Sequence, residues 1–222
     1  MKNSKLRRIL LTLACAVLLV SLSVGATLAY LTSKTSVVQN TFTVGNVEIT
    51  LDEQIVDLYG DKASVSFNET TGEEIRTTNP DSTDRGLKNT YKLLPGHNYM
   101  KDPTVHVTRG SEQCWLFVKI VDEIVAIQDE TTVAAQMAAK EWVELDAIAY
   151  PGVYYYKHIV DARTAAQDVV VFEEFTIVDN IENEALAAYA NKTITVQAYA
   201  VQADGFDSAA AAYAAAPCTW GN

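Results

Sequence analysis

The amino-acid sequence predicts a mainly β protein, a jelly-roll-like antiparallel β-sandwich with a few short helices, preceded by an N-terminal signal helix. The first observation is that short runs of alternating apolar and polar residues recur along the chain, which is typical of strands with one buried face. The second is that turn-forming pairs such as Pro95-Gly96 and Pro151-Gly152 separate these runs. Many short strands with spaced turns and few helices favour a sandwich or a jelly roll.

The first 29 residues have the layout of an export signal. Four basic residues within the first eight positions precede an apolar run over 9–24, and small residues follow it. This order is typical of a basic region, a short apolar core and a cleavage site. Cleavage could follow Ala29 or Ala26. The alternative is an uncleaved anchor, because an apolar core of about 16 residues lies just below the roughly 17–25 needed to span a bilayer.

The charge of the chain limits its partners. It has 17 Lys plus Arg and 28 Asp plus Glu, a formal net charge of −11 at pH 7. Loss of residues 1–29 removes four basic side chains and no acidic one, which leaves 13 against 28 and a net charge of −15. Such a chain is repelled by nucleic acid and by anionic membrane surfaces. We therefore expect no nucleic-acid partner, and membrane contact only through the signal segment before cleavage.

Seven alternating runs are predicted strands. Within 47–51 the apolar side chains share one face, and in "TVHVT" Val105 and Val107 point inward while His106 points outward. In order along the chain, the runs are 47–51, 89–94, 104–108, 114–121, 153–160, 169–178 and 193–201.

Three segments have helical character and one is polar. We predict a helix over 131–145 with Val133, Met137 and Trp142 on one face, and a short helix over 181–191. Asp207 would cap a third helix that Pro217 ends. The polar stretch from about 61 to 88 predicts an exposed loop or a hairpin. No internal repeat or linker divides the chain, so residues 43–222 are expected to form a single domain.

Cys114 and Cys218 are the cysteines that remain after cleavage. The alternation in "CWLFVKIV" places Cys114 on one face with Leu116, Val118 and Ile120, which is typical of a small buried core residue. An exported protein can also keep cysteines oxidised, so a disulfide between Cys114 and Cys218 is the other interpretation. The sequence leaves both open.

Four blocks of the sequence resemble one family. "GATLAYLTSKTSVVQNTFTVGNVEITLDE", "LLPGHNYMKDPTVHV", "YYYKHIV" and "VQAYAVQADGF" resemble, in this order, the TasA/camelysin family of exported proteins of Gram-positive bacteria. The first block is the most specific, and it resembles signals that the signal peptidase SipW processes. The resemblance implies cleavage after Ala29, so that Tyr30 becomes the first mature residue.

The resemblance also implies a function. It predicts a secreted structural protein of the cell surface or biofilm matrix whose subunits form fibres, each subunit donating its N-terminal strand to the next. The arm 30–42, "YLTSKTSVVQNTF", is rich in Thr, Ser and Val and has no Pro or Gly, so nothing in it prevents strand addition. A disordered terminus is the alternative. The candidate donor residues are Leu31, Ser33, Thr35, Val37, Val38 and Phe42. Expected partners are other copies of the chain, other matrix or cell-surface components, and SipW.

An enzymatic function is the main alternative, because camelysin is described as a metalloprotease. A common zinc-protease motif needs two His one helical turn apart. The chain has only His97, His106 and His158, and their spacing does not match this motif. We expect no catalytic activity and no cofactor, and leave metal binding open, including calcium at the turn 79–84. A third interpretation is a monomeric binding or adhesion module at the cell surface.

Overall fold

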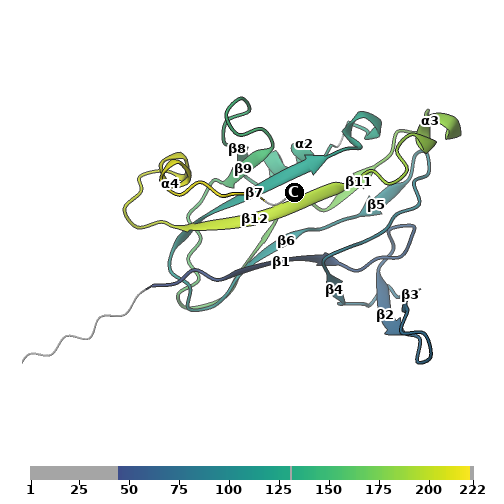
Figure 1. The fold of residues 1–222 in the computed structure, drawn as a ribbon, viewed down its shortest axis with the longest axis horizontal. Coiled ribbons are helices and arrows are strands. Elements are labelled where there is room, and N and C mark those ends of the chain that lie inside the picture. Colours follow the sequence, from purple (N-terminus) through teal and green to yellow (C-terminus); the bar gives the residue numbers. More distant parts are fainter. Residues whose placement is uncertain (1–44, 131, 221–222) are drawn as a thin grey trace, which may run out of the picture. The chain divides into compact units, whose positions relative to one another are not determined.

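The computed structural model describes residues 45–130 and 132–220, which lie in one compact unit. Two four-stranded antiparallel sheets dominate it (Figure 1). In spatial order, the first sheet consists of β10 (Gln167–Val170), β6 (Thr104–Val107), β1 (Ile49–Gln54) and β4 (Arg85–Gly86). The second consists of β12 (Ile194–Gln202), β7 (Cys114–Asp122), β9 (Val153–Tyr156) and β8 (Trp142–Glu144). The prediction of a mainly β, antiparallel protein is confirmed.

The remaining elements are short. Two small antiparallel pairs join β2 (Ala63–Phe67) to β3 (Glu74–Thr78) and β5 (Asn98–Met100) to β11 (Glu174–Thr176). The helices are the 3₁₀ turn η1 (Val125–Ile127), α2 (Val133–Ala139), α3 (Asn183–Ala187) and α4 (Ala209–Ala215). None of the helices in the described ranges is long and apolar enough to cross a bilayer.

The main core lies between the two four-stranded sheets. The alternation of β6 turns Val105 and Val107 inward, where both are fully buried. Leu116 and Val118 of β7 belong to the same core from the second sheet. The predicted inward faces of both strands are therefore confirmed.

Strand β7 is buried on both faces, which explains its nearly continuous apolar sequence. Its other face carries Trp115 and Phe117 into a second core. Helix α4 covers this second core with Ala209, Ala212 and Tyr213.

Two predicted strands need correction. The run 89–94 forms no strand, because its backbone hydrogen bonds go elsewhere: Lys92 N–H donates to Leu58 O at 2.8 Å, and Leu94 N–H donates to the Tyr99 hydroxyl at 2.7 Å. The run 169–178 is divided between β10 and β11, which belong to different sheets.

The prediction of a helix over 131–145 was too long. Helix α2 ends at Ala139, and Glu141 has a φ of 66°, a left-handed conformation that does not continue a helix. The chain then enters β8, where Trp142 is buried as a strand residue. Helix α4 is also capped differently, because the Ser208 hydroxyl, rather than Asp207, accepts from Ala211 N–H at 3.2 Å.

The polar stretch and the predicted turns match the structure. Strands β2 and β3 form the hairpin within 61–88. At the Pro151-Gly152 turn, Gly152 has a φ of 74°, and a Cβ there would lie 2.5 Å from Ile120 O, so only glycine fits. The predicted signal peptide (1–29) and arm (30–42) lie outside the described residues.

Candidate functional site

Strand β12 is the edge of the second sheet and pairs only with β7 among the described strands. Glu123 N–H donates to Thr193 O at 3.0 Å, and Ala203 N–H donates to Gln113 O at 2.7 Å. Backbone groups of an antiparallel strand point to alternate sides, so these two bonds fix which residues face β7. The residues whose N–H and C=O groups point away from β7 are Ile194, Val196, Ala198, Ala200 and Gln202.

Strand β1 has a similar open side. Thr108 N–H donates to Glu48 O at 2.9 Å, which places Glu48 and every second residue after it toward β6. The backbone groups of Ile49 and Leu51 therefore point away from β6. On that side β4 pairs only with Glu53 and Gln54, so no described strand covers Ile49 and Leu51.

Strands β1 and β12 lie next to each other, and we call the region between their open sides the seam. The core-facing side chains along it pack against the main core but are only half-buried. A strand added at the seam would bury more of their apolar surface. These side chains are Val47, Ile49 and Leu51 on the β1 side and Ile194, Val196, Ala198 and Ala200 on the β12 side.

A cavity of about 1080 Å³ opens at one end of the seam. Leu51 and Val196, from the two open strands, line it together with Phe175. The segment 86–94 and residues 186–196 form its other walls. The cavity also exposes polar side chains of Glu53, Asn89 and Lys101. Its mixed lining of apolar walls and a few polar groups is typical of binding sites.

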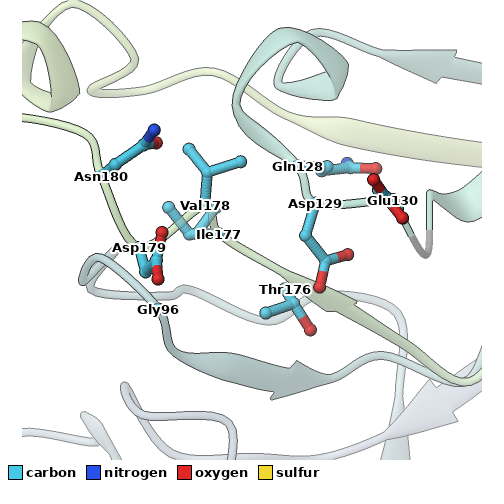
Figure 2. A pocket seen from close by; sticks show the side chains of 9 residues that line it. All are labelled: Gly96, Gln128, Asp129, Glu130, Thr176, Ile177, Val178, Asp179 and Asn180. Carbon is cyan, nitrogen blue, oxygen red and sulfur yellow. The ribbon is translucent and has the colours of Figure 1, made fainter.

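A second cavity, of about 630 Å³, lies on a different part of the surface and is lined by 96, 128–130 and 176–180. Figure 2 shows the side chains of Asp129 and Asp179 on opposite sides of this cavity. Across the ranges 45–130 and 132–220, no three His, Cys, Asp or Glu residues come together in a group that could hold a metal ion.

The three histidines are dispersed. His97 Nε2 lies 2.8 Å from Tyr59 O, and His158 Nε2 lies 2.8 Å from Glu141 Oε2. His106 is half-buried on the outer face of the first sheet, as predicted. None of the three belongs to a metal-binding group within the described residues.

His106 is held between two carboxylates. Its Nδ1 lies 2.7 Å from Asp168 Oδ1 and its Nε2 lies 2.9 Å from Asp52 Oδ1. Arg85 also bonds Asp52, and its Nη1 lies 2.9 Å from Asp102 Oδ2. Burial alone would lower the pKa of His106, but the hydrogen bonds with Asp52 and Asp168 outweigh it and raise the pKa. The cluster links β1, β6 and β10 across the sheet.

Both cysteines are free thiols in the structure. Cys114 is fully buried in the main core, whereas Cys218 packs against the second core on the other face of β7. Burial raises the pKa of the Cys114 thiol to about 11. The interpretation of Cys114 as a buried core residue is confirmed.

The turn 79–84 uses its oxygens internally. Asn79 Oδ1 accepts from Asp81 N–H at 3.1 Å, and Asp84 Oδ2 accepts from Val65 N–H at 3.0 Å. These contacts fix the turn and its attachment to β2, which favours the structural interpretation of the turn.

The predicted cleavage residues Ala29 and Tyr30 lie outside the described residues. The same holds for the donor residues Leu31, Ser33, Thr35, Val37, Val38 and Phe42. Sequence reasoning missed the seam and the polar cluster of Glu53, Asn89 and Lys101. One signal for the seam was present in the sequence, because residues 194–202 contain no charged side chain.

Comparisons with known proteins add no relative. The chain matches no protein-family model, and neither the search of curated proteins nor the search of solved structures returned a match.

Proposed function

We propose that this chain is an exported structural protein of the cell surface or biofilm matrix, of the TasA/camelysin type, that assembles into fibres by N-terminal strand donation. Cleavage after Ala29 would release the arm 30–42, and the arm of one subunit would then enter the seam of the next. The observation that carries the proposal is the seam, where two open strand edges border half-buried core side chains.

A jelly-roll topology is part of the proposal. The described chain passes from one four-stranded sheet to the other between β6 and β7 and between β9 and β10, and it returns before β12. A jelly roll is built from two antiparallel sheets, so a chain that crosses between the two sheets supports this topology.

The composition of β12 supports its role as an acceptor. Proteins usually protect edge strands by keeping them short or by placing charged residues or proline on them. The edge strands β8 and β10 are three and four residues long, and each contains an acidic residue. Strand β12 has nine residues, "ITVQAYAVQ", with no charge and no proline. It is unprotected against pairing with another strand.

The arm fits this edge in length and charge. Its 13 residues exceed the nine of β12, so it can pair along the whole edge. Lys34 is its only charged side chain, and cleavage adds a positive amino terminus. The remainder of the chain is strongly acidic, so the arm is attracted to a neighbouring subunit even though whole subunits repel each other.

Strand addition would provide two kinds of stabilisation. The outward backbone groups of five β12 residues would gain partners, and alternate arm side chains would enter the seam. One parity of the arm presents Leu31, Thr35 and Val37, which would cover the half-buried apolar side chains. Each such apolar burial contributes about 25 cal/mol per Å² of surface removed from water.

The test compares two chains, one starting at Tyr30 and one starting at Gly45. Light scattering and negative-stain microscopy should detect filaments for the first and monomers for the second. A synthetic peptide of residues 30–42 should bind the shorter chain and should stop the longer chain from growing into filaments. Equal assembly of both chains would remove the donor role from the arm and would contradict the proposal.

A further inference from the structure

A buried polar cluster lies at the base of the large cavity and is independent of the proposed assembly. Glu53 and Lys101 are charged residues with exposed fractions of only 6% and 8%. Lys101 Nζ donates to Glu53 Oε2 at 2.5 Å, and Asn89 Nδ2 donates to Glu53 Oε1 at 2.9 Å. One carboxylate therefore holds an amine and a carboxamide at its two oxygens.

The carboxamide of Asn89 is oriented by four neighbours. Its Oδ1 accepts from Val56 N–H at 3.1 Å and from Arg76 Nη1 at 2.5 Å. Its Nδ2 donates to Gln54 O at 2.9 Å in addition to Glu53. The donors lie on the oxygen side and the acceptors on the nitrogen side, so this network fixes which atom is which.

We propose that Lys101 and Asn89 become joined by an intramolecular isopeptide bond, with Glu53 transferring the protons. Glu53 Oε2 takes one proton from the Lys101 ammonium group, and the resulting lone pair on Nζ attacks Cγ of Asn89. The π electron pair of the carbonyl moves to Oδ1, where Arg76 and the Val56 N–H stabilise the developing negative charge.

The bond between Cγ and Nδ2 of Asn89 then breaks. Glu53 passes the first proton to Nδ2 and takes the second proton from Nζ, so ammonia leaves and a neutral amide remains. Lys101 ammonium, Glu53 carboxylate and Asn89 carboxamide are thereby converted into an amide, a carboxylic acid and ammonia. Net charge is unchanged and no oxidant or reductant is needed.

The surroundings favour this reaction over a static ion pair. A buried ion pair is costly to desolvate, and the reaction replaces its two charges with neutral groups. One carboxylate holds both the amine and the carboxamide, which lowers the entropic cost of bringing Nζ of Lys101 to Cγ of Asn89. Tyr91, beside the cluster, has a pKa raised by burial and then by the charge of Glu53. Ammonia can leave through the adjoining cavity, which is lined by Glu53, Asn89 and Lys101.

Other lysine–carboxylate pairs lack these features. Lys140 pairs with Glu173 at 2.7 Å and Lys192 with Glu123 at 3.0 Å, but in both pairs the side chains are more exposed than in the Glu53–Lys101 pair. Neither pair has a described asparagine bonded to its carboxylate. The Glu53 cluster is thus distinguished by a carboxamide with its oxygen already bound by two donors.

The new bond would fasten the wall of the cavity. Asn89 belongs to the segment between β4 and β5, and Lys101 directly follows β5. The cross-link would close the loop 89–101 beside Glu53 of β1, next to the seam.

The test is the intact mass of the folded, exported protein under denaturing conditions. We expect it to be lighter by one ammonia than the mass that the mature sequence requires. Digestion with trypsin should yield one branched species that joins the peptide containing Asn89 to the peptide containing Lys101, because acylated Lys101 is no longer cleaved. This branched species distinguishes the bond from ammonia loss at an asparagine elsewhere.

Substitutions of the three cluster residues test the role of each in forming the bond. Lys101→Arg and Glu53→Gln should each restore the full mass, whereas Asn89→Asp should form the same bond with loss of water in place of ammonia. The matched control is Lys92→Arg. Lys92 lines the same cavity, but its Nζ lies over the Tyr59 ring, 5.8 Å from the ring centroid, whereas Lys101 Nζ is bonded to Glu53. This variant should keep the ammonia loss. Circular dichroism checks folding of each variant. A folded unsubstituted protein with the full mass and no branched peptide would overturn the proposal, whatever the variants do.

Discussion

The two sides of the sandwich are closed in different ways. On one side the edge strands β8 and β10 are short, and the buried Trp142 of β8 donates from Nε1 to Val170 O of β10 at 3.0 Å. One side chain thereby bridges the two sheets. On the other side β1 and β12 leave the seam, where backbone groups and half-buried apolar side chains have no described strand to cover them. The edges at β8 and β10 are therefore short and joined by a side chain, whereas β12 remains free to pair with another strand.

The largest expected effect is on filament formation. It is tested by two proline substitutions in edge strands of the same sheet. The register shows that the N–H groups of both Ala198 in β12 and Glu144 in β8 point away from the neighbouring strand. Proline at such a position removes no ladder hydrogen bond within the subunit. We expect Ala198→Pro to reduce filament yield by up to about tenfold, because a donated strand loses a hydrogen bond worth about 0.5–1.5 kcal/mol. Glu144→Pro should assemble normally.

Filament yield by sedimentation and electron microscopy measures this difference, with circular dichroism to show that both variants fold. If the two variants assemble equally well, the open side has no special part in assembly.

The next largest effect concerns the side closed by β8 and β10, and it is a change in the free energy of unfolding. Trp142→Ala should lower the free energy of unfolding by about 3–5 kcal/mol, because it empties a fully packed site and removes the hydrogen bond to Val170. The adjacent Val143 is 39% exposed, so Val143→Ala should change the free energy by about 0.5 kcal/mol or less. Urea denaturation followed by tryptophan fluorescence or circular dichroism checks both values. A loss below about 1 kcal/mol for Trp142→Ala would show that this side is not closed by the indole.

Sequence reasoning predicted the parts of the fold that local pattern decides. The alternation in β6 and β7 predicted their inward faces correctly, because a half-buried strand must alternate. It failed at 89–94, where an alternating pattern exists but the backbone bonds to Leu58 and to the Tyr99 hydroxyl. It also failed at Trp142, because the helical spacing with Met137 continues past Glu141, whose left-handed backbone ends the helix.

The candidate site was mostly outside the reach of the sequence. Whether a strand is an edge depends on which strand lies beside it, and β12 and β1 are separated by more than a hundred residues. The same applies to Glu53, Asn89 and Lys101, which share no motif and meet only when β1 and the segment after β4 fold together. The donor arm was predicted from the resemblance of the sequence, whereas its proposed acceptor required the structure.

The smallest expected effect is on the pH dependence of stability, and it concerns the His106 cluster on the outer face of the first sheet. The pKa of His106 is raised in the folded state by Asp52 and Asp168, so its protonated form contributes stability that is fully present below the unfolded value of about 6.5. This contribution is lost as pH rises from about 6.5 through the raised pKa. We expect a loss of less than about 1 kcal/mol, since the ring is partly exposed.

Urea denaturation across this pH range should show the loss in the unsubstituted protein and a flatter profile for His106→Asn. His158→Asn is the matched control, because His158 bonds only the exposed Glu141 and links no strands across a sheet. Identical pH profiles for His106→Asn and the unsubstituted protein would show that the cluster does not stabilise the folded state through its charge.

The most direct test of strand donation is amide hydrogen exchange at single residues of β12. The measurement uses NMR on the chain starting at Gly45, with and without the peptide of residues 30–42. Without the peptide, the N–H groups of Thr195, Tyr199 and Val201 should exchange slowly because they face β7, and those of Ile194, Val196, Ala198 and Ala200 should exchange fast. Adding the peptide should slow the second set selectively. If Ile194, Val196, Ala198 and Ala200 exchange at the same rate with and without the peptide, strand donation to β12 is contradicted.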